Sequence, residues 1–101
     1  MPGKCEVRLL RAAEDDLSEA IIYIAQDNPV AAERLLAHIE KNLENLASYP
    51  HSGTAPQEPV IAAAGFRYLV VDNYLVFYIV EDDVVFVHRI IHGARDYRRI
   101  S

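Results

Sequence analysis

The sequence predicts an α+β fold in which a helical hairpin packs on one face of a twisted antiparallel sheet, with the element order β-α-α-β-β-β. Apolar residues recur at a helical spacing over residues 12–48 and at the spacing of β-strands over residues 66–91. A segment rich in proline and glycine separates these two halves. Because 101 residues have room for only one core, we expect one domain over residues 1–101.

A short strand is expected at residues 4–10, where apolar and polar side chains alternate loosely. A helix should follow from about Ala12 to Gln26. Glu14, Asp15 and Asp16 would lie in its first turn, where the positive end of the helix dipole favours carboxylates. Its apolar stripe is formed by Leu17, Ala20, Ile21 and Ile24.

The second helix is expected from Pro29 to about Ser48. Asn28 suits the N-cap, and proline is well tolerated at the first helical position. Because the break between the two helices is so short, they should form an antiparallel hairpin. The expected buried side consists of Ala32, Leu35, Leu36, Ile39, Leu43 and Leu46.

Residues 49–65 should be mostly irregular, because they contain three prolines and two glycines. Three strands are then expected at residues 66–72, 74–80 and 84–91, which are rich in β-branched and aromatic residues. Polar turn residues separate them, so they should form an antiparallel meander. Strand alternation favours core packing for Tyr74, Phe77 and Tyr78 over exposure to a partner.

The composition places the chain among ordinary globular proteins. Cys5 is the only cysteine, which excludes an internal disulfide and favours a buried structural role in a reducing cytoplasm. The N-terminus has no apolar segment typical of a signal peptide, and no apolar run approaches the roughly 20 residues of a membrane span. We therefore expect a cytoplasmic protein that does not enter the membrane.

The net charge of −5 hides an asymmetry along the chain. Residues 86–101 hold four arginines and one aspartate, a net of +3, so the preceding 85 residues carry −8. A basic end on an acidic body suggests a local anion-binding face, and it argues against a protein that coats nucleic acid or reads DNA sequence by itself. A solvated C-terminal tail explains the same composition equally well.

Known catalytic fingerprints are absent, including phosphate-binding loops, zinc-protease motifs and nucleophile elbows. His88 and His92 lie at the end of the last expected strand, His51 in the irregular segment and His38 on a helix. Without a tight spacing or cysteine partners, neither a metal site nor a cofactor is expected. The acidic pairs are better explained as a helix start and a turn than as acid–base catalysts.

The candidate functional residues lie at the end of the last expected strand and beyond it. Arginine can bind phosphate or carboxylate, tyrosine can stack on a base, and histidine can transfer a proton near neutral pH. This set could cleave RNA through its own 2′-hydroxyl, dock an acidic peptide, or be inert surface. Its members are His88, Arg89, His92, Arg95, Tyr97, Arg98 and Arg99, and Arg67 could join them across the sheet.

The order of these features resembles the RelE/ParE toxin superfamily over about 80 residues. The matching segments are Ala13-Glu14-Asp15-Asp16-Leu17, Ile21-Ile22-Tyr23-Ile24, Asn28-Pro29-Val30-Ala31-Ala32, Leu46 with Tyr49-Pro50-His51-Ser52-Gly53, Gly65-Phe66-Arg67, Tyr74-Leu75-Val76-Phe77-Tyr78 and Arg89-Ile90-Ile91-His92-Gly93-Ala94-Arg95-Asp96. The resemblance implies a toxin of a type II toxin–antitoxin module, bound by a cognate antitoxin.

The resemblance also implies two alternative targets. RelE-like members cleave mRNA on the ribosome, whereas ParE-like members are thought to inhibit DNA gyrase and lack the nuclease residues. Residues 42–66 contain no lysine or arginine, unlike the RelE pattern, and a body of charge −8 is poorly suited to a ribosome. We therefore favour the ParE-like branch, in which the chain is not an enzyme.

In the ParE-like branch the arginines and the histidine would bind the target or the antitoxin, and no residue would be catalytic. That binding set is Arg67, Arg89, His92, Arg95, Arg98 and Arg99. In the RelE-like alternative, which needs no metal, Arg67 and Arg89 would hold phosphate. His92 or Tyr97 would move the proton, and Arg95 would stabilise charge. A third alternative is a detoxified relative that only binds its antitoxin.

Overall fold

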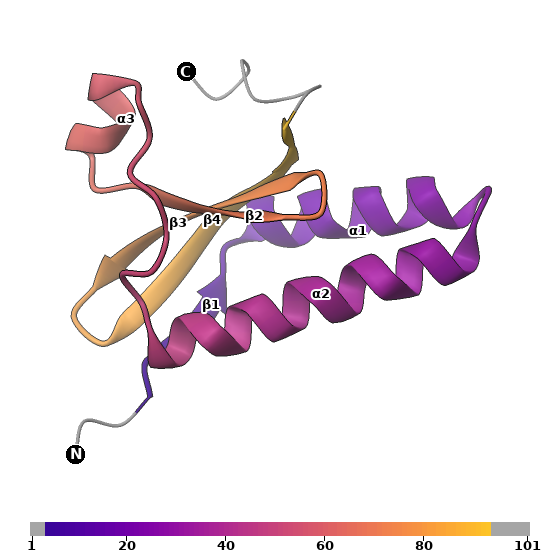
Figure 1. The fold of residues 1–101 in the computed structure, drawn as a ribbon, viewed down its shortest axis with the longest axis horizontal. Helices are drawn as coiled ribbons and strands as arrows, with labels where there is room; N and C mark the ends of the chain where they lie inside the picture. Colours follow the sequence, from indigo (N-terminus) through magenta and orange to yellow (C-terminus); the bar gives the residue numbers. More distant parts are fainter. Residues whose placement is uncertain (1–3, 94–101) are drawn as a thin grey trace.

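The computed structural model describes residues 4–93, and its helices and strands follow the predicted order with one addition (Figure 1). The elements are β1 (Glu6–Leu9), α1 (Arg11–Ala25), α2 (Pro29–Ser48), α3 (Pro59–Ala63), β2 (Arg67–Val71), β3 (Tyr74–Glu81) and β4 (Val84–His92). The predicted α+β class is confirmed. The helix bounds agree with the predicted ones to within one residue, and the Asn28-Pro29 signal marks the break between the two helices.

The break between the helices has the predicted form. The Asn28 side chain accepts a hydrogen bond from the Ala31 backbone N–H at 3.1 Å, and Pro29 occupies the first turn of α2. Figure 1 shows α1 and α2 side by side as an antiparallel hairpin. No helix among residues 4–93 is both long enough and apolar enough to cross a membrane.

The four strands form one sheet in the order β1-β4-β3-β2. The meander β2–β3–β4 is antiparallel, as predicted, with turns at residues 72–73 and 82–83. β1 pairs with β4 in parallel, so the sheet is mixed and not purely antiparallel. Parallel neighbours need a long connection, which the helical hairpin and the first two strands of the meander supply.

The main core lies between the helical hairpin and one face of the sheet. Val76 and Val87 on the strands and Ile39 and Leu46 on α2 are almost completely buried in one cluster. Burial of this apolar area is the dominant stabilising term for the fold. Tyr78 belongs to the same cluster, which confirms its predicted packing role.

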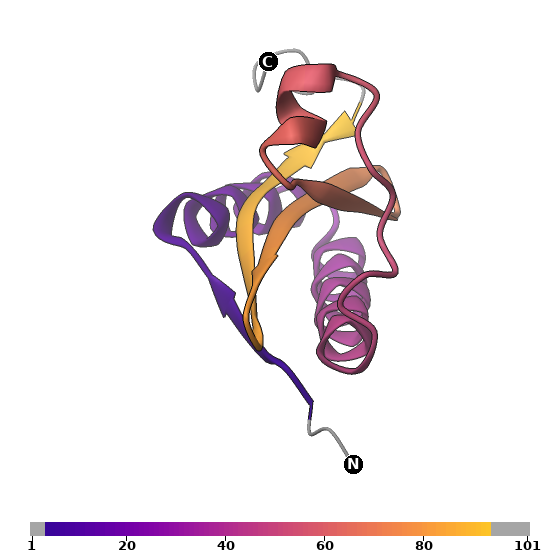
Figure 2. The same ribbon diagram turned by 90° about the vertical axis from the view of Figure 1, so that its left-hand side faces the viewer.

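α3 covers part of the opposite face of the sheet. Figure 2 shows β2 passing between α3 above it and α2 below it. Ile61 of α3 is buried, as are Phe77 and Ile91, and none of the three belongs to the main cluster. The prediction of a mostly irregular segment missed this short helix, although Pro59, which suits a first helical position, was a usable signal.

Candidate functional site

The structure does not gather the predicted site residues into one cluster. Arg67 pairs with Tyr78 in the sheet, whereas His92 pairs with Tyr74. These two rows are four residues apart, which is about 13 Å along the strands. One strand, β3, also lies between the two residues in the sheet. Arg67 therefore does not join His92 in a common site.

Arg67 anchors the segment that follows α2. Its guanidinium donates a hydrogen bond to the Gly53 carbonyl oxygen at 2.9 Å, and the Gly53 N–H donates to the Tyr78 hydroxyl at 2.8 Å. Thr54 then forms two backbone hydrogen bonds with Tyr68 at the outer edge of β2. The arginine that was expected to bind phosphate thus holds this segment against the sheet.

Tyr78 is the buried centre of that anchor. Burial raises the pKa of the Tyr78 hydroxyl, while the hydrogen bond from Gly53 and the nearby Arg67 and Ser52 oppose the rise. The phenol therefore stays protonated at neutral pH and serves as a hydrogen-bonding group. The sequence gives little indication of this contact, because Gly53 and Tyr78 are 25 residues apart.

Arg89 is held by Asp16 of α1. Its Nε and Nη2 atoms donate to the two Asp16 carboxylate oxygens at 2.7 and 2.9 Å, and the Ile90 backbone N–H donates to the same carboxylate at 2.9 Å. The Asp16 side chain is only 12% exposed. The prediction that Asp16 lies in the first turn of the helix was wrong, since Glu14 is the acidic residue there.

The Asp16 carboxylate takes the place of a neighbouring strand. β1 pairs with β4 only as far as Val87, so the next part of β4 has no strand on that side. There α1 supplies a carboxylate that accepts the Ile90 N–H and neutralises Arg89. Such charge-assisted, two-point contacts are among the stronger hydrogen bonds in proteins.

His88 lies at an irregularity in β4. Tyr78 pairs with Val87 and the preceding Phe77 pairs with Arg89, so His88 is the extra residue of a β-bulge. Its ring meets the Phe66 ring edge-on, with the centroids 5.0 Å apart. Burial lowers the pKa of His88, while the charge of Glu81 opposes that shift. The neutral imidazole is therefore the favoured form.

This environment predicts how stability depends on pH. Because the folded-state pKa of His88 lies below its unfolded value near 6.5, unfolding takes up a proton as the pH falls through that value. The free energy of unfolding should therefore decrease below about pH 6.5. Chemical denaturation at pH 7.5 and 5.5 measures this decrease in the free energy of unfolding. The decrease should be smaller in His88→Phe. It should remain in His51→Ala, which replaces an exposed histidine. Equal losses in wild type and His88→Phe would contradict the assignment.

His92 closes the last row of the sheet. Its ring lies edge-on to the Tyr74 ring with the centroids 5.4 Å apart, and the following Gly93 N–H donates to the Asn73 carbonyl oxygen at 2.9 Å. The remaining predicted site residues lie outside the described residues. They are Arg95, Tyr97, Arg98 and Arg99.

The other histidines do not come together either. His38 on α2 contacts both carboxylate oxygens of Asp72 at 3.0 Å, which ties the helix to the β2–β3 turn. Within residues 4–93, no group of three or more potential ligands could hold a metal ion.

The described part of the chain is strongly acidic. Residues 4–93 contain seven lysines and arginines against fourteen aspartates and glutamates, a net of −7. Each arginine on a strand also has a partner within the fold: Arg8 contacts Glu6, and Arg67 and Arg89 have the contacts given above.

Comparisons with known proteins agree with this fold. The model of the family described as the ParE toxin of the type II toxin–antitoxin system, parDE, matches residues 7–97. Toxin RelE2 of Caulobacter vibrioides is 37% identical over 81 residues, which cover 79% of this chain and 85% of that protein.

Two solved structures share the architecture at low sequence identity. A chain of the chromosomal ParDE system from P. aeruginosa superposes with a TM-score of 0.72 at 17% identity, covering 88% of this chain and 96% of its own length. A chain of the RelBE2 complex from Mycobacterium tuberculosis superposes with a TM-score of 0.62 at 20% identity, covering 88% and 98%. The family model spans nearly the whole chain and the relative is similar along most of its length, so the predicted superfamily is confirmed: this chain belongs to the ParE toxin family of type II toxin–antitoxin systems, within the RelE/ParE superfamily.

Proposed function

We propose that this toxin inhibits growth by binding DNA gyrase without catalysing a reaction, and that a cognate antitoxin neutralises it. The proposal rests on the observation that the Arg67 and Arg89 side chains both bind groups of the toxin's own fold. A ribosome-dependent nuclease would use these arginines to hold RNA phosphate. Here one guanidinium binds a loop carbonyl and the other binds both oxygens of Asp16.

The charge of the described body supports the same choice. A protein that approaches ribosomal RNA gains affinity by neutralising phosphates with lysine and arginine. Residues 4–93 carry a net charge of −7, which opposes approach to such a dense polyanion. Binding to a protein target does not require the body of the toxin to be basic.

The basic residues after β4 are the proposed contacts to the target or the antitoxin. Arg95, Arg98 and Arg99 provide three guanidinium groups within five residues. Guanidinium groups bind carboxylates in a two-point geometry, which suits a protein partner. The similar structures from P. aeruginosa and M. tuberculosis are toxin–antitoxin assemblies, which supports an antitoxin as one such partner.

Induced expression in bacterial cells tests the proposal. Plasmid DNA should lose negative supercoiling before incorporation of labelled amino acids falls, because gyrase would be blocked while ribosomes continue. Co-expression of the neighbouring open reading frame should restore both growth and supercoiling. An immediate fall in amino-acid incorporation with normal plasmid topology would favour the RelE-like nuclease, and unaffected growth would favour a detoxified relative.

A further inference from the structure

The helical hairpin ends in a tip that extends past the sheet. Figure 1 shows α1 and α2 continuing beyond the end of the sheet to the short turn that joins them. Three of the seven exposed large hydrophobic residues within residues 4–93 lie at this tip. They are Ile22, Tyr23 and Val30, with exposed fractions of 62%, 63% and 62%. Single exposed apolar residues are common, but a group of three so close together indicates an interaction surface.

Two of these residues face away from the core of the toxin. Ile22 lies two positions from Ala20 and Ile24, which pack in or against the core. Val30 lies two positions before Ala32, which is buried. Two positions along a helix turn a side chain by about 200°, so Ile22 and Val30 face away from the sheet. Because β-branched residues also lower helix propensity, these two side chains contribute little to the fold.

The charges around the tip are mostly negative. Residues 12–33 hold six aspartates and glutamates and no lysine or arginine. Exposed Glu19 and Glu33 lie one helical turn from the two outward apolar residues, and Asp27 lies in the turn between the helices. Arg34 is the first cation along α2. A surface that complements the tip therefore has an apolar centre with lysine or arginine around it.

The charge of the tip favours a different protein over a second copy of this chain. Contact between two tips would bring their carboxylates together, and like charges across an interface weaken binding. An enzyme that acts on DNA exposes lysine and arginine where it holds phosphates. The proposed target therefore carries surfaces of the required charge.

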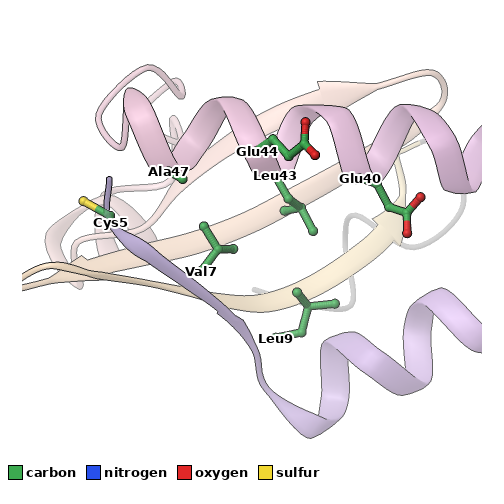
Figure 3. Close-up of a pocket in the computed structure, with 7 residues that line it drawn as sticks. All are labelled: Cys5, Val7, Leu9, Glu40, Leu43, Glu44 and Ala47. Carbon is green, nitrogen blue, oxygen red and sulfur yellow. The ribbon is translucent and has the colours of Figure 1, made fainter. Parts of the chain in front are cut away.

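We propose that the tip of the hairpin, with Ile22, Tyr23 and Val30 as its apolar centre, docks the toxin on an apolar surface of gyrase that is rimmed by lysine and arginine. The inference rests on the proposed function and adds a second contact region to the basic residues after β4. The tip lies away from the groove that Leu43 and Ala47 help to line beside β1 (Figure 3). Substitutions at the tip therefore leave that groove intact.

Binding of the purified full-length toxin to purified gyrase tests the proposal. Ile22→Ala with Val30→Ala should weaken binding about tenfold, because two apolar anchors are lost from the centre of the interface. The same variant should unfold at a temperature no lower than wild type, because alanine is the better helix former. Weaker binding by a protein of undiminished stability would separate a docking role from a structural one.

Matched variants make this test specific. Val60 and Val70 are 82% and 65% exposed on α3 and β2, and replacing both with alanine should leave binding unchanged. Glu19→Gln with Glu33→Gln should weaken binding about threefold and reduce its salt dependence. Arg34→Gln should strengthen binding about twofold, because it removes a cation next to the acidic tip.

The remaining outcomes distinguish this inference from the proposed function. If wild type binds gyrase and the double alanine variant binds equally well, the tip is not the docking surface and the proposed function stands. If wild type does not bind gyrase, both are overturned. If the double alanine variant does not fold, unchanged binding of the charge variants overturns the inference. Dimers of wild type that the alanine variant loses would also overturn it, in favour of a second copy.

Discussion

Replacing Asp16 with alanine is expected to lower the free energy of unfolding by about 2–3 kcal/mol. The Asp16 carboxylate accepts hydrogen bonds from the Arg89 side chain and from the Ile90 backbone. Alanine leaves the Arg89 guanidinium without this counter-charge and the Ile90 N–H without an acceptor. Urea denaturation of the wild type and the variant measures the loss.

Asp15 provides the matched control for this prediction. It precedes Asp16 on the same helix, but it is 65% exposed and its contact with Arg11 is a long 3.7 Å. Asp15→Ala should cost less than about 0.5 kcal/mol, as is usual for exposed pairs. Asp16→Asn should fall between the two, because an amide oxygen can still accept from Ile90. Equal stabilities of Asp15→Ala and Asp16→Ala would show that the contact contributes nothing to the fold.

Gly53→Ala is expected to lower the free energy of unfolding by about 3 kcal/mol, the upper end of the usual cost of overpacking. A Cβ atom there would lie 2.5 Å from the Tyr78 hydroxyl oxygen and 2.9 Å from the Tyr68 carbonyl oxygen. The Tyr78 ring is fully buried and cannot swing aside. The Tyr68 carbonyl is fixed by its hydrogen bond from Thr54. Thermal or urea denaturation measures the effect.

A second glycine and a double variant make this prediction specific. Within residues 4–93, the nearest atom to an added Cβ at Gly93 would be the Asn73 carbonyl oxygen at 3.5 Å, an ordinary contact distance. Gly93→Ala should therefore change stability by less than about 0.5 kcal/mol. Tyr78→Phe removes the hydroxyl and should relieve part of the clash, so the double variant Gly53→Ala/Tyr78→Phe should lose less than the sum of the single losses. A Gly53→Ala protein as stable as Gly93→Ala would refute the close contact.

Local patterns in the sequence predicted most of the fold. The spacing of apolar residues and the Asn28-Pro29 signal predict the two helices, because these features depend on neighbours in sequence. The parallel pairing of β1 with β4 was not predicted, since it joins residues nearly 80 positions apart. Such pairing depends on how the helical hairpin returns the chain to the sheet.

The candidate site was harder to predict, because it depends on which face each side chain occupies. The bulge at His88 interrupts the regular alternation of side chains between the two faces of β4, and no local residue pattern predicts this bulge. Asp16 was interpreted through the helix dipole, although its partners lie more than 70 residues away. The sequence alone allows Arg67 to join Arg89 and His92 across the sheet, whereas strand register places it beside Gly53, whose carbonyl oxygen it binds.

Titration of the purified toxin into two parallel assays tests the proposed target most directly. One assay follows supercoiling of relaxed plasmid by gyrase, and the other follows translation of a reporter mRNA by purified ribosomes. We expect supercoiling to stop at toxin concentrations where translation continues and the mRNA stays intact. Ribosome-dependent cleavage of the mRNA with gyrase fully active would contradict it.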